Sequence, residues 1–421
     1  DVYKRQNKIG GYINLKGKNM SGLWKWIFIL TIMLPIGGSD YSWLNFLQIK
    51  YEISILDVMF ALMLIYELFS LRLPLKVKRQ KLLWICIYIL TVIVFIGTLI
   101  KSYEIYNVRA IRDSFNYLMC LEFLIAPMIM KNREVTYKDI IDWTGNGYIG
   151  FTIITLLTYI GYNQIGNRVG GNCFSLSIML IPYEIYRILQ NRNGKNRKSL
   201  IIVFCFMINA VITQNRTAIF FVGISVLYVF VLEMRNEVSK KKIEKIVLMV
   251  IFALLIILGL TTTKSEVLVR IITGGEIDTF AGRVNTFNYY FNLIKENLSG
   301  YGFGFIMHFF TAGNYQLPLE TYQIDNALVV YGIKGGILML ILFSVLALIP
   351  FKANLICNLK EKKLFRCSYL LLLVATYAMT SQIIQGRATA LFIWFLVGVS
   401  IQNVGKGSID YENTKKSSWR K

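Results

Sequence analysis

The stretch "LLWICIYILTVIVFIGTLI", residues 82–100, decides the fold class, because it is a long apolar run without a charged residue. It comes close to the roughly 20 apolar residues that carry a helix across a bilayer. A second run, "KIVLMVIFALLIILGL" at 245–260, has the same character. The chain of 421 residues is 55% hydrophobic with a mean hydropathy of +0.52, which is more apolar surface than a soluble fold could bury. We therefore predict an all-α, polytopic membrane protein.

Apolar segments of this kind recur along the whole chain and predict a bundle of about twelve transmembrane helices. No internal repeat is visible, which disfavours a transporter built from repeated halves. We place the spans at residues 23–38, 52–71, 82–100, 114–130, 145–162, 173–190, 199–214, 217–234, 246–262, 326–350, 367–384 and 388–404.

Lys and Arg alternate between the loops of this topology. One set of alternate loops holds 33 of the 46 basic residues and the other holds 11, while Lys25 and Lys334 lie near the ends of spans. Because basic residues concentrate on the cytoplasmic side, the alternation predicts a multi-pass protein of the bacterial plasma membrane with both termini cytoplasmic. The net charge of +22 then reflects loops that face anionic lipid, so we expect membrane lipid and no nucleic acid as a partner.

The topology divides the chain into five segments. A polar N-terminal tail covers residues 1–22; whether it is native throughout, or whether Met20 is the true start, stays open at this point. The other segments are helices one to nine (23–262), a long extracellular loop (263–325), helices ten to twelve (326–404) and a basic cytoplasmic tail (405–421).

The extracellular loop contains a predicted amphipathic helix. In "VNTFNYYFNLIKENL" (284–298), the residues Val284, Phe287, Phe291, Ile294 and Leu298 fall on one helical face. Such a helix would lie at the membrane surface or pack on the bundle. The glycines of "SGYGFGF" (299–305) end it, and they are a weak signal for a phosphate cradle because no Lys-Ser/Thr pair follows.

Metal and cofactor sites have little support in the sequence. The six cysteines are scattered without a CxxC pair, and the single histidine, His308, has no second histidine with which to bind a metal. We expect no cofactor. His308 is flanked by aromatic residues, where it would serve either as a packed interfacial side chain or as a base.

Basic residues are scarce on the outer side, so each needs an explanation. Arg168, in "NQIGNRVGGNCF" (163–174), is either an arginine that reaches to lipid headgroups or a contact for phosphate or sugar. Arg283 and Arg387 are either solvated surface residues or members of the same site.

Arg216 follows Asn215 in "AVITQNRTAIFF" (210–221), at the start of the eighth span. As a membrane anchor it would gain little there, because a cation at a helix N-terminus opposes the macrodipole. A cavity for an anion is the other possibility, since guanidinium binds phosphate in a bidentate fashion.

Asp325 and Asn326 stand at the edge of the tenth span. Asp325 is either the N-cap of that helix or a carboxylate that accepts a proton from a sugar hydroxyl.

Four motifs in order resemble the O-antigen ligase and O-antigen polymerase superfamily. They are "RVGGN" (168–172), "TQNRTA" (213–218), "AGRVNTFNYYFNLIKENLSGYGFGF" (281–305) and "DNALVVYGIKGG" (325–336). The sequence departs from the family at two positions: Asn215 replaces the usual Ser, and Asp325 replaces the His of the ligases.

The resemblance implies a metal-independent glycosyltransferase of the membrane C-type architecture. Its substrate would be an undecaprenyl-diphosphate-linked glycan, with Arg216 and Arg283 on the diphosphate and Asp325 as the catalytic base. His308 is the reserve candidate for the base. The residues that would bind substrate are Arg168, Asn172, Asn215, Asn326, Arg387 and His308.

Because this chain has Asp325 where the ligases have His, we predict a polymerase of capsule or exopolysaccharide repeat units. A flippase and a chain-length regulator are its candidate partners. A ligase that uses another acceptor, a flippase or other transporter, and a non-catalytic member of an export complex are the alternatives. A flippase should show related halves and charges near the midplane of the membrane.

Overall fold

The fold is known from a computed structural model of the chain. It describes residues 22–36, 43–69, 78–105, 135–161, 172–190, 196–213, 215–234, 288–309, 319–321, 326–377 and 387–403, with single-residue or two-residue gaps within 43–69 and 326–377 and isolated positions between 110 and 127.

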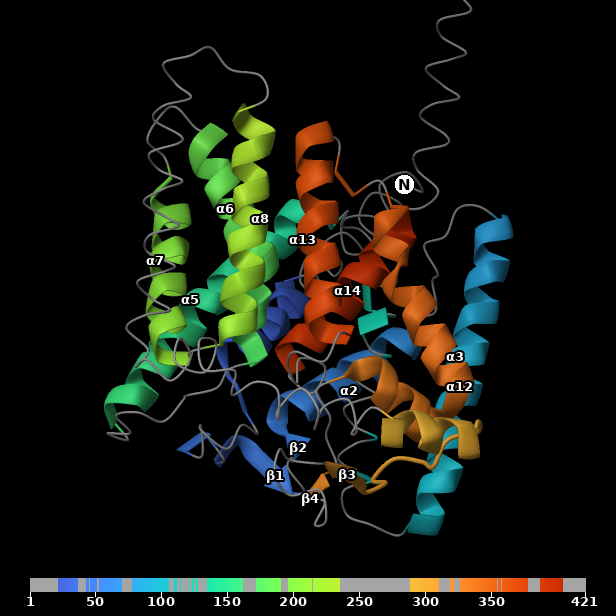
Figure 1. The fold of residues 1–421 in the computed structure, drawn as a ribbon. Helices are drawn as coiled ribbons and strands as arrows, with labels where there is room; N and C mark the ends of the chain where they lie inside the picture. Colours follow the sequence, from blue (N-terminus) through green and yellow to red (C-terminus); the bar gives the residue numbers. More distant parts are fainter. Residues whose placement is uncertain are drawn as a thin grey trace, which may run out of the picture.

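The described residues are mostly helical, which confirms the predicted all-α class (Figure 1). Strands are confined to two short antiparallel hairpins, β1 (Gln48–Lys50) with β2 (Ile53–Ser54) and β3 (Met307–Phe309) with β4 (Leu319–Thr321). Besides helical segments at 22–33 and 288–296, the helices are α2 (Ile55–Phe69), α3 (Lys78–Ile105), α5 (Tyr137–Gly161), η2 (Asn172–Leu176), α6 (Ser177–Gln190), α7 (Arg197–Thr213), α8 (Arg216–Met234), α12 (Ala327–Ala347), η3 (Ile349–Phe351), α13 (Leu359–Tyr377) and α14 (Arg387–Asn403).

Helices occupy most of the predicted spans. By length and apolarity, two stretches of the described residues suffice to cross a membrane, Ile85–Tyr103 and Leu328–Phe351. Shorter apolar helices cover Gly22–Met33, Thr217–Glu233 and Ala388–Ile401. The ninth predicted span, 246–262, lies outside the described residues, and the fourth, 114–130, is described only at isolated positions. The count of twelve spans therefore stays a prediction.

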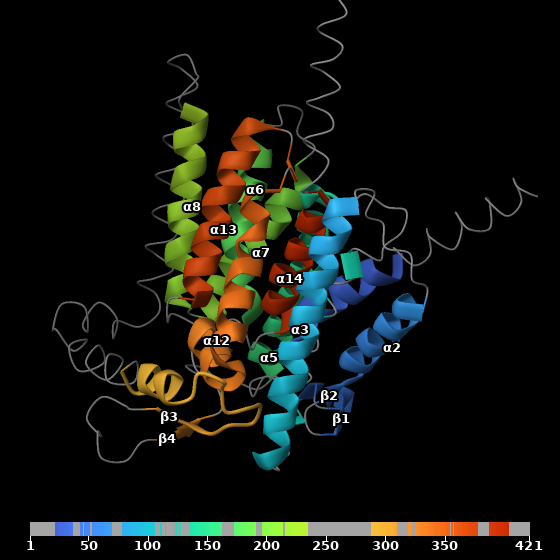
Figure 2. The same cartoon turned by 90° about the vertical axis from the view of Figure 1, so that its right-hand side faces the viewer.

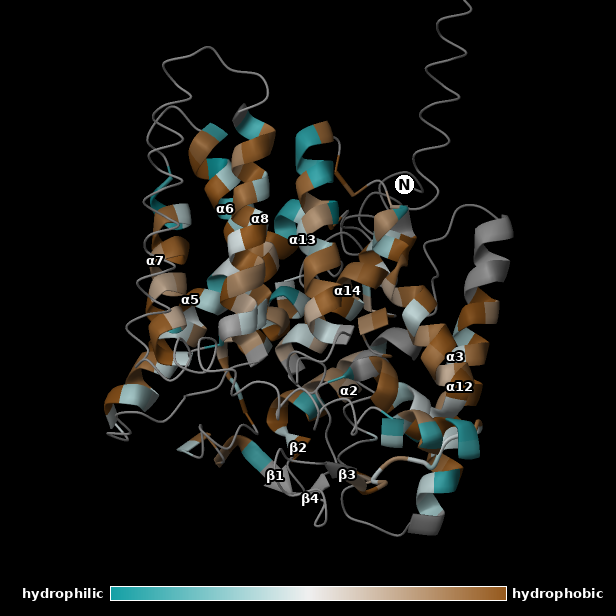
Figure 3. Ribbon diagram, viewed as in Figure 1, coloured by the Kyte–Doolittle hydropathy of each residue, from teal (hydrophilic) through white to brown (hydrophobic). Residues whose placement is uncertain are grey.

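Polar contacts join four helices, α5, α6, α8 and α13, at one end of the bundle, which we call the ion-pair end. Glu233, at the end of α8, accepts hydrogen bonds from Gln190 at the end of α6 (2.9 Å) and from Lys360 at the start of α13 (3.0 Å). Arg187 of α6 pairs with Asp142 of α5 at 2.8 Å. Figure 3 shows this hydrophilic end at the top of α6, α8 and α13, above a largely hydrophobic middle.

These contacts fix the directions of the helices. Since α6 and α8 end at the ion-pair end, both begin at the opposite end; since α13 begins at the ion-pair end, α14 begins at the opposite end. The end of α12 lies beside α13, because the Tyr369 hydroxyl donates to the Ala347 carbonyl oxygen at 2.7 Å. Hence α12 also begins at the opposite end, where Figures 1 and 2 show the two hairpins.

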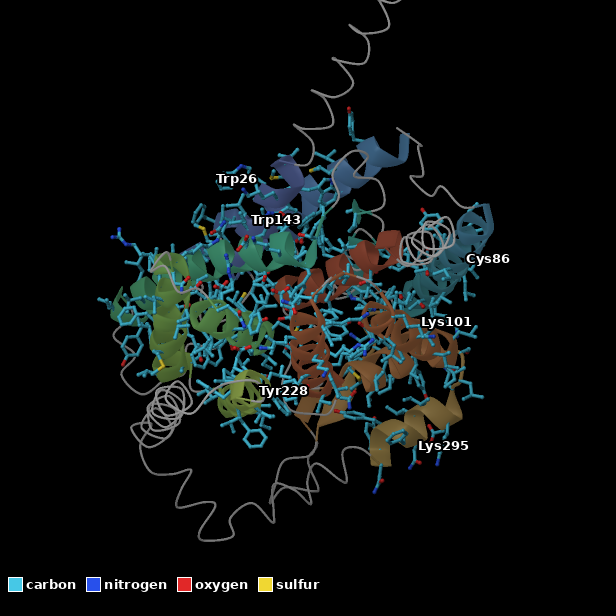
Figure 4. The ribbon with its side chains drawn as sticks, turned by 90° about the horizontal axis from the view of Figure 1, so that it is seen from above. Trp26, Cys86, Lys101, Trp143, Tyr228 and Lys295 are labelled. Carbon is cyan, nitrogen blue, oxygen red and sulfur yellow. The ribbon has the colours of Figure 1, made fainter. Side chains whose placement is uncertain are left out.

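Helix α14 forms the centre of the bundle. Every residue from 388 to 401 is buried, as expected for a helix that is surrounded on all sides. Phe395 packs edge-on against Trp143 of α5 and Phe28 of the 22–33 helix, with ring centroids 5.8 and 5.2 Å away. Figure 4 shows Trp143 between α5 and the N-terminal segment. The other elements of the bundle are thus arranged around α14.

Candidate functional site

Four predicted site residues stand at the beginnings of helical elements, all at the end opposite the ion-pair end. Asn172 begins η2, which continues into α6, and Arg216 begins α8. Asn326 is the N-cap of α12, and Arg387 is the first described residue of α14. Of these elements, η2 packs on α7 and on the central helix α14, and α12 also packs on α14. Helix N-termini carry partial positive charge and free amide donors, so this arrangement suits an anion.

Two of the three asparagines predicted for the site have capping roles. The Asn326 Oδ1 atom accepts a hydrogen bond from the Val329 amide at 3.2 Å, and its side chain is only 6% exposed. In the same way the Asn215 Oδ1 atom accepts from the Ala218 amide at 3.1 Å. Both bonds satisfy backbone donors of the first helical turn. Any substrate contact of these residues would therefore come from the amide nitrogen.

One of the two predicted roles of Asp325, the N-cap of the tenth span, is filled by Asn326. An N-cap side chain must reach the amide three residues further on, and Asn326 does so. Asp325 is therefore not the cap of this helix, and the other interpretation of Asp325, as a carboxylate that accepts a proton, stays a prediction. Its own position lies outside the described residues, as do the positions of Arg168 and Arg283.

The side chains of four other predicted site residues are not among those that the structure describes. For Asn172, Arg216 and Arg387 the backbone is described and the side chain is not. The same holds for His308, which lies on β3 opposite Glu320 of β4. Among the described side chains there is no group of three His, Cys, Asp or Glu residues that could hold a metal ion.

A buried polar row leads from the start of α8 into the bundle. On α7, Thr213 and Asn209 lie one turn apart, and the Thr213 hydroxyl donates to the Asn209 carbonyl oxygen at 2.8 Å. The Asn209 amide nitrogen donates to the Thr152 hydroxyl of α5 at 2.8 Å. Polar groups are expensive within a membrane bundle, which makes this row a functional candidate. The sequence analysis missed it, although the i, i+4 spacing of Asn209 and Thr213 before Arg216 was visible.

Several atoms near this row have unused hydrogen-bonding capacity. Among the described side chains, the Asn209 Oδ1, Ser175 hydroxyl and Ser177 hydroxyl are buried without a hydrogen-bond partner. Buried polar atoms in native proteins are normally satisfied, by ordered water where no protein group is available. The interior beneath the α7–α8 junction is therefore suited to water or to a polar part of a substrate.

The glycine segment after the loop helix has a structural role. Gly300, Gly302 and Gly304 all have positive φ, at 81°, 96° and 80°. A Cβ atom at Gly302 would lie 2.9 Å from the Ser102 amide nitrogen of α3. The amide of Phe303 donates to the Ser102 hydroxyl at 2.6 Å, and the Lys101 ammonium donates to the Ser299 carbonyl oxygen at 2.6 Å. The amides of Phe303, Tyr301 and Gly302 bind protein acceptors, which disfavours a phosphate cradle in this segment.

Helix α12 is broken at Gly336, and residues of the glycine segment form hydrogen bonds with the backbone groups of α12 around the break. Gly336 has φ 75° and ψ −176°, which are not helical. The carbonyl oxygen of Ile333 accepts from the Tyr301 amide at 2.8 Å, and that of Lys334 accepts from the Gly302 amide at 2.9 Å. After the break, the Ile337 amide donates to the Leu298 carbonyl oxygen at 2.9 Å. Broken helices are tolerated at membrane depth only where protein or water satisfies the freed groups.

The loop helix 288–296 packs on the first half of α12. Tyr290, Leu293 and Ile294 are buried against a cluster that includes Val329 and Ile333. The bundle-packed alternative is therefore correct for this segment. The predicted apolar face is partly wrong, because Phe291 is 52% exposed and Leu298 is 58% exposed. The buried face of the loop helix is instead the one that is turned toward α12. Two residues of the predicted apolar face, Val284 and Phe287, lie outside the described residues.

Burial also affects two tyrosines beside this helix. It raises the pKa of the Tyr289 phenol, with a further contribution from Tyr301, and it raises the pKa of the Tyr301 phenol. Both therefore stay neutral hydroxyls at neutral pH.

Comparison with known families confirms the resemblance found in the motifs. Residues 201–344 match the family described as O-antigen ligase. The matched region runs from α7 to α12 and includes three of the four motifs, with "RVGGN" outside it. No curated protein is similar enough to be matched.

Proposed function

We propose that this chain, whose residues 201–344 match the O-antigen ligase family, is a polymerase of lipid-linked glycan repeat units. The superfamily comprises membrane proteins that handle lipid-linked glycans. The proposed substrate is an undecaprenyl-diphosphate-linked oligosaccharide at the outer face of the plasma membrane. The enzyme would transfer the growing glycan from its lipid diphosphate to a sugar hydroxyl of the next lipid-linked unit.

The observation that carries the proposal is that these helix starts lie at the same end of the bundle. Arg216 and Arg387 begin α8 and α14, and Asn326 caps α12. Partial positive charge at helix N-termini and the guanidinium groups both favour a phosphate ligand. A site at the end of a membrane bundle also lets a polyprenyl tail stay in lipid while its diphosphate enters the protein.

The reaction requires one bond to break and one to form. The bond between the anomeric carbon and the phosphate oxygen breaks, and its electron pair leaves with the lipid diphosphate. An acceptor hydroxyl forms the new glycosidic bond and gives its proton to Asp325. Fixed guanidinium groups of Arg216 and Arg283 would stabilise the charge on the leaving diphosphate more strongly than water does.

The polymerase is preferred over the ligase because of Asp325. The ligases of the family have His at this position, whereas this chain has a carboxylate. A carboxylate is sufficient to accept the proton of an attacking hydroxyl. A ligase would differ in its acceptor only, so the products decide between the two.

The test replaces the arginines and examines surface glycan. Arg216→Ala and Arg283→Ala are expressed in the native host in place of the wild-type protein, with Lys295→Ala as the control. Lys295 is exposed on the loop helix and points away from the bundle in Figure 4. We expect the arginine variants to reach the membrane at normal levels and to reduce the high-mass ladder to single repeat units.

Other outcomes would contradict the proposal. A normal ladder in both arginine variants would refute the diphosphate site. Repeat units retained on the cytoplasmic side would identify a flippase. Full-length polymer that stays on its lipid carrier, without transfer to a final acceptor, would identify a ligase.

A further inference from the structure

Lys334 is a buried cation within a segment long enough to cross the membrane. It lies in Leu328–Phe351 and its side chain is 2% exposed. All residues from 329 to 336 are buried, so this half of α12 is surrounded by protein and does not face lipid. The sequence analysis placed Lys334 near a span end, whereas the structure places it in the interior. A charged residue in such a location is costly, and in membrane bundles it marks a substrate or ion pathway.

Two faces of this half-helix have different neighbours. Val329 and Ile333 pack against the loop helix. Val330 belongs to the main core of the bundle. Because residues four apart lie on one side of a helix, Lys334 shares the Val330 side and stands two turns below Asn326. Lys334 is therefore on the side of α12 that faces the bundle.

The direction of helical side chains brings the ammonium group toward the helix start. In an α-helix each side chain leans toward the N-terminus and covers the preceding turn. The eight residues from Asn326 to Lys334 correspond to about 12 Å along the axis. Because the lysine side chain extends toward the helix start, its ammonium group lies closer to Asn326 than the Lys334 backbone does. The charge thus approaches the site formed by the starts of α8, α12 and α14 from inside the bundle.

The break at Gly336 holds Lys334 in place. The Lys334 carbonyl oxygen accepts from the Gly302 amide, and a Cβ atom on Gly336 would lie 2.5 Å from the Leu298 carbonyl oxygen. Both halves of the backbone around Lys334 are therefore tied to the glycine segment. A side chain on a backbone that is fixed in this way loses little conformational entropy when it binds a ligand.

We propose that Lys334 is a further cationic ligand for the diphosphate of the lipid-linked glycan, which it binds from the interior of the bundle. This inference rests on the proposed function and adds a residue to the site that the family motifs do not assign. An ammonium group offers three donors and a full positive charge, and complements the planar guanidinium of Arg216. Its charge opposes the build-up of negative charge on the diphosphate as the glycan leaves.

The test measures binding of undecaprenyl diphosphate to the full-length protein in lipid nanodiscs. The variants are Lys334→Met, Lys334→Arg and Arg216→Ala, with Lys295→Met as the matched control for loss of a lysine charge. We expect Lys334→Met to weaken binding about tenfold or more, since hydrogen bonds to charged groups contribute about 1.5–3 kcal/mol. Lys334→Arg should stay within about threefold of wild type, because it keeps the charge, and Lys295→Met should bind as the wild type does.

The thermal midpoint of each variant, measured without lipid, separates binding from structure. A cation in the last turn of the 327–335 half-helix would also favour the negative end of its dipole. If Lys334→Met lowers the midpoint but leaves the affinity unchanged, that structural role is the correct one and the proposal is wrong. If Lys334→Met fails to fold, Lys334→Arg and Lys334→Gln decide, because loss of affinity in the glutamine variant alone supports the proposal and equal affinity overturns it.

The Arg216 variant separates this inference from the proposed function. Loss of affinity in Arg216→Ala with normal affinity in Lys334→Met overturns the role of Lys334 and leaves the proposed function standing. Normal affinity in both variants overturns the diphosphate site as a whole.

Discussion

The amide of Gly302 donates a 2.9 Å hydrogen bond to the carbonyl oxygen of Lys334, and this bond joins the glycine segment after the loop helix to the broken helix α12. It replaces a bond that a continuous helix would have made within itself. The two halves of α12 are thereby held at a fixed break, and the half that carries Asn326 is positioned by the loop.

Gly336→Ala should destabilise the protein and reduce its activity. At φ 75° and ψ −176°, a backbone region that essentially only glycine adopts, an alanine is strained by about 1–3 kcal/mol, and its Cβ atom would meet the Leu298 carbonyl oxygen. The thermal midpoint in detergent is the measurement. Gly97→Ala is the control, because it lies within helix α3 with nothing within 4 Å of its Cβ position, so an unchanged or raised midpoint is expected there. Equal midpoints for both variants would show that the break is not required.

Ser102→Ala should weaken the contact between α3 and the loop. It removes the acceptor of the Phe303 amide and leaves a buried donor unsatisfied, which costs about 1–3 kcal/mol. We expect a lower midpoint and faster proteolysis of the loop. Ser344→Ala is a suitable comparison, since that hydroxyl bonds only locally to the Leu340 carbonyl oxygen. A Ser102 variant as stable as the Ser344 variant would contradict this role.

Asn215→Ala should cost about 1 kcal/mol of stability through loss of the α8 N-cap. Asn215→Ser should cost much less, because serine caps as well and is the usual residue of the family. If polymerisation falls in the alanine variant but not in the serine variant, capping explains the requirement. Loss of polymerisation in both, with normal stability, would instead indicate a substrate contact by the asparagine amide.

Lys360→Met should destabilise the ion-pair end, because Glu233 is buried and loses its cation. The double variant Lys360→Met with Glu233→Gln should recover part of the loss. A double-mutant cycle on the midpoints should give a coupling of about 0.5–3 kcal/mol. Additive effects would show that the 3.0 Å pair contributes nothing beyond its separate members.

Asp325→Asn should lower the turnover of lipid-linked repeat units about a hundredfold or more, the usual loss when a general base is removed. Asp325→His, which installs the residue of the ligases, should retain more activity than the asparagine variant. Turnover is followed by the appearance of lipid-linked dimers and longer products. Full activity in Asp325→Asn would transfer the role of base to another group, with His308 as the next residue to replace.

Much of the helical framework could be predicted from the sequence, because long apolar runs in a membrane protein have few alternatives to helices. The ends of α7 and α8 were predicted within a few residues, and the loop helix was found in the right place. Its buried face was wrong, since the apolar pattern of that segment does not reveal whether lipid or α12 will cover it.

The break in α12 could not be predicted from local pattern. The residues from 326 to 350 form one apolar run, and Gly335 and Gly336 within it are also compatible with a continuous helix. What breaks the helix is a set of partners in the loop, at Leu298, Tyr301 and Gly302. The interior position of Lys334 could not be predicted for the same reason. The capping role was assigned to Asp325 as one alternative, whereas its neighbour Asn326 is the cap.

The Ser102–Phe303 contact has a consequence for biosynthesis. Its partners are 201 positions apart in the chain, and the adjoining bonds to Ile333 and Lys334 extend the interval further. Contacts of such separation form only after the intervening chain has been made. The first half of α12 can reach its final position only when both it and the loop have left the ribosome and joined α3. The earlier helices therefore enter the membrane as an incomplete assembly, and the broken helix α12 is completed at a late stage of the synthesis of the chain.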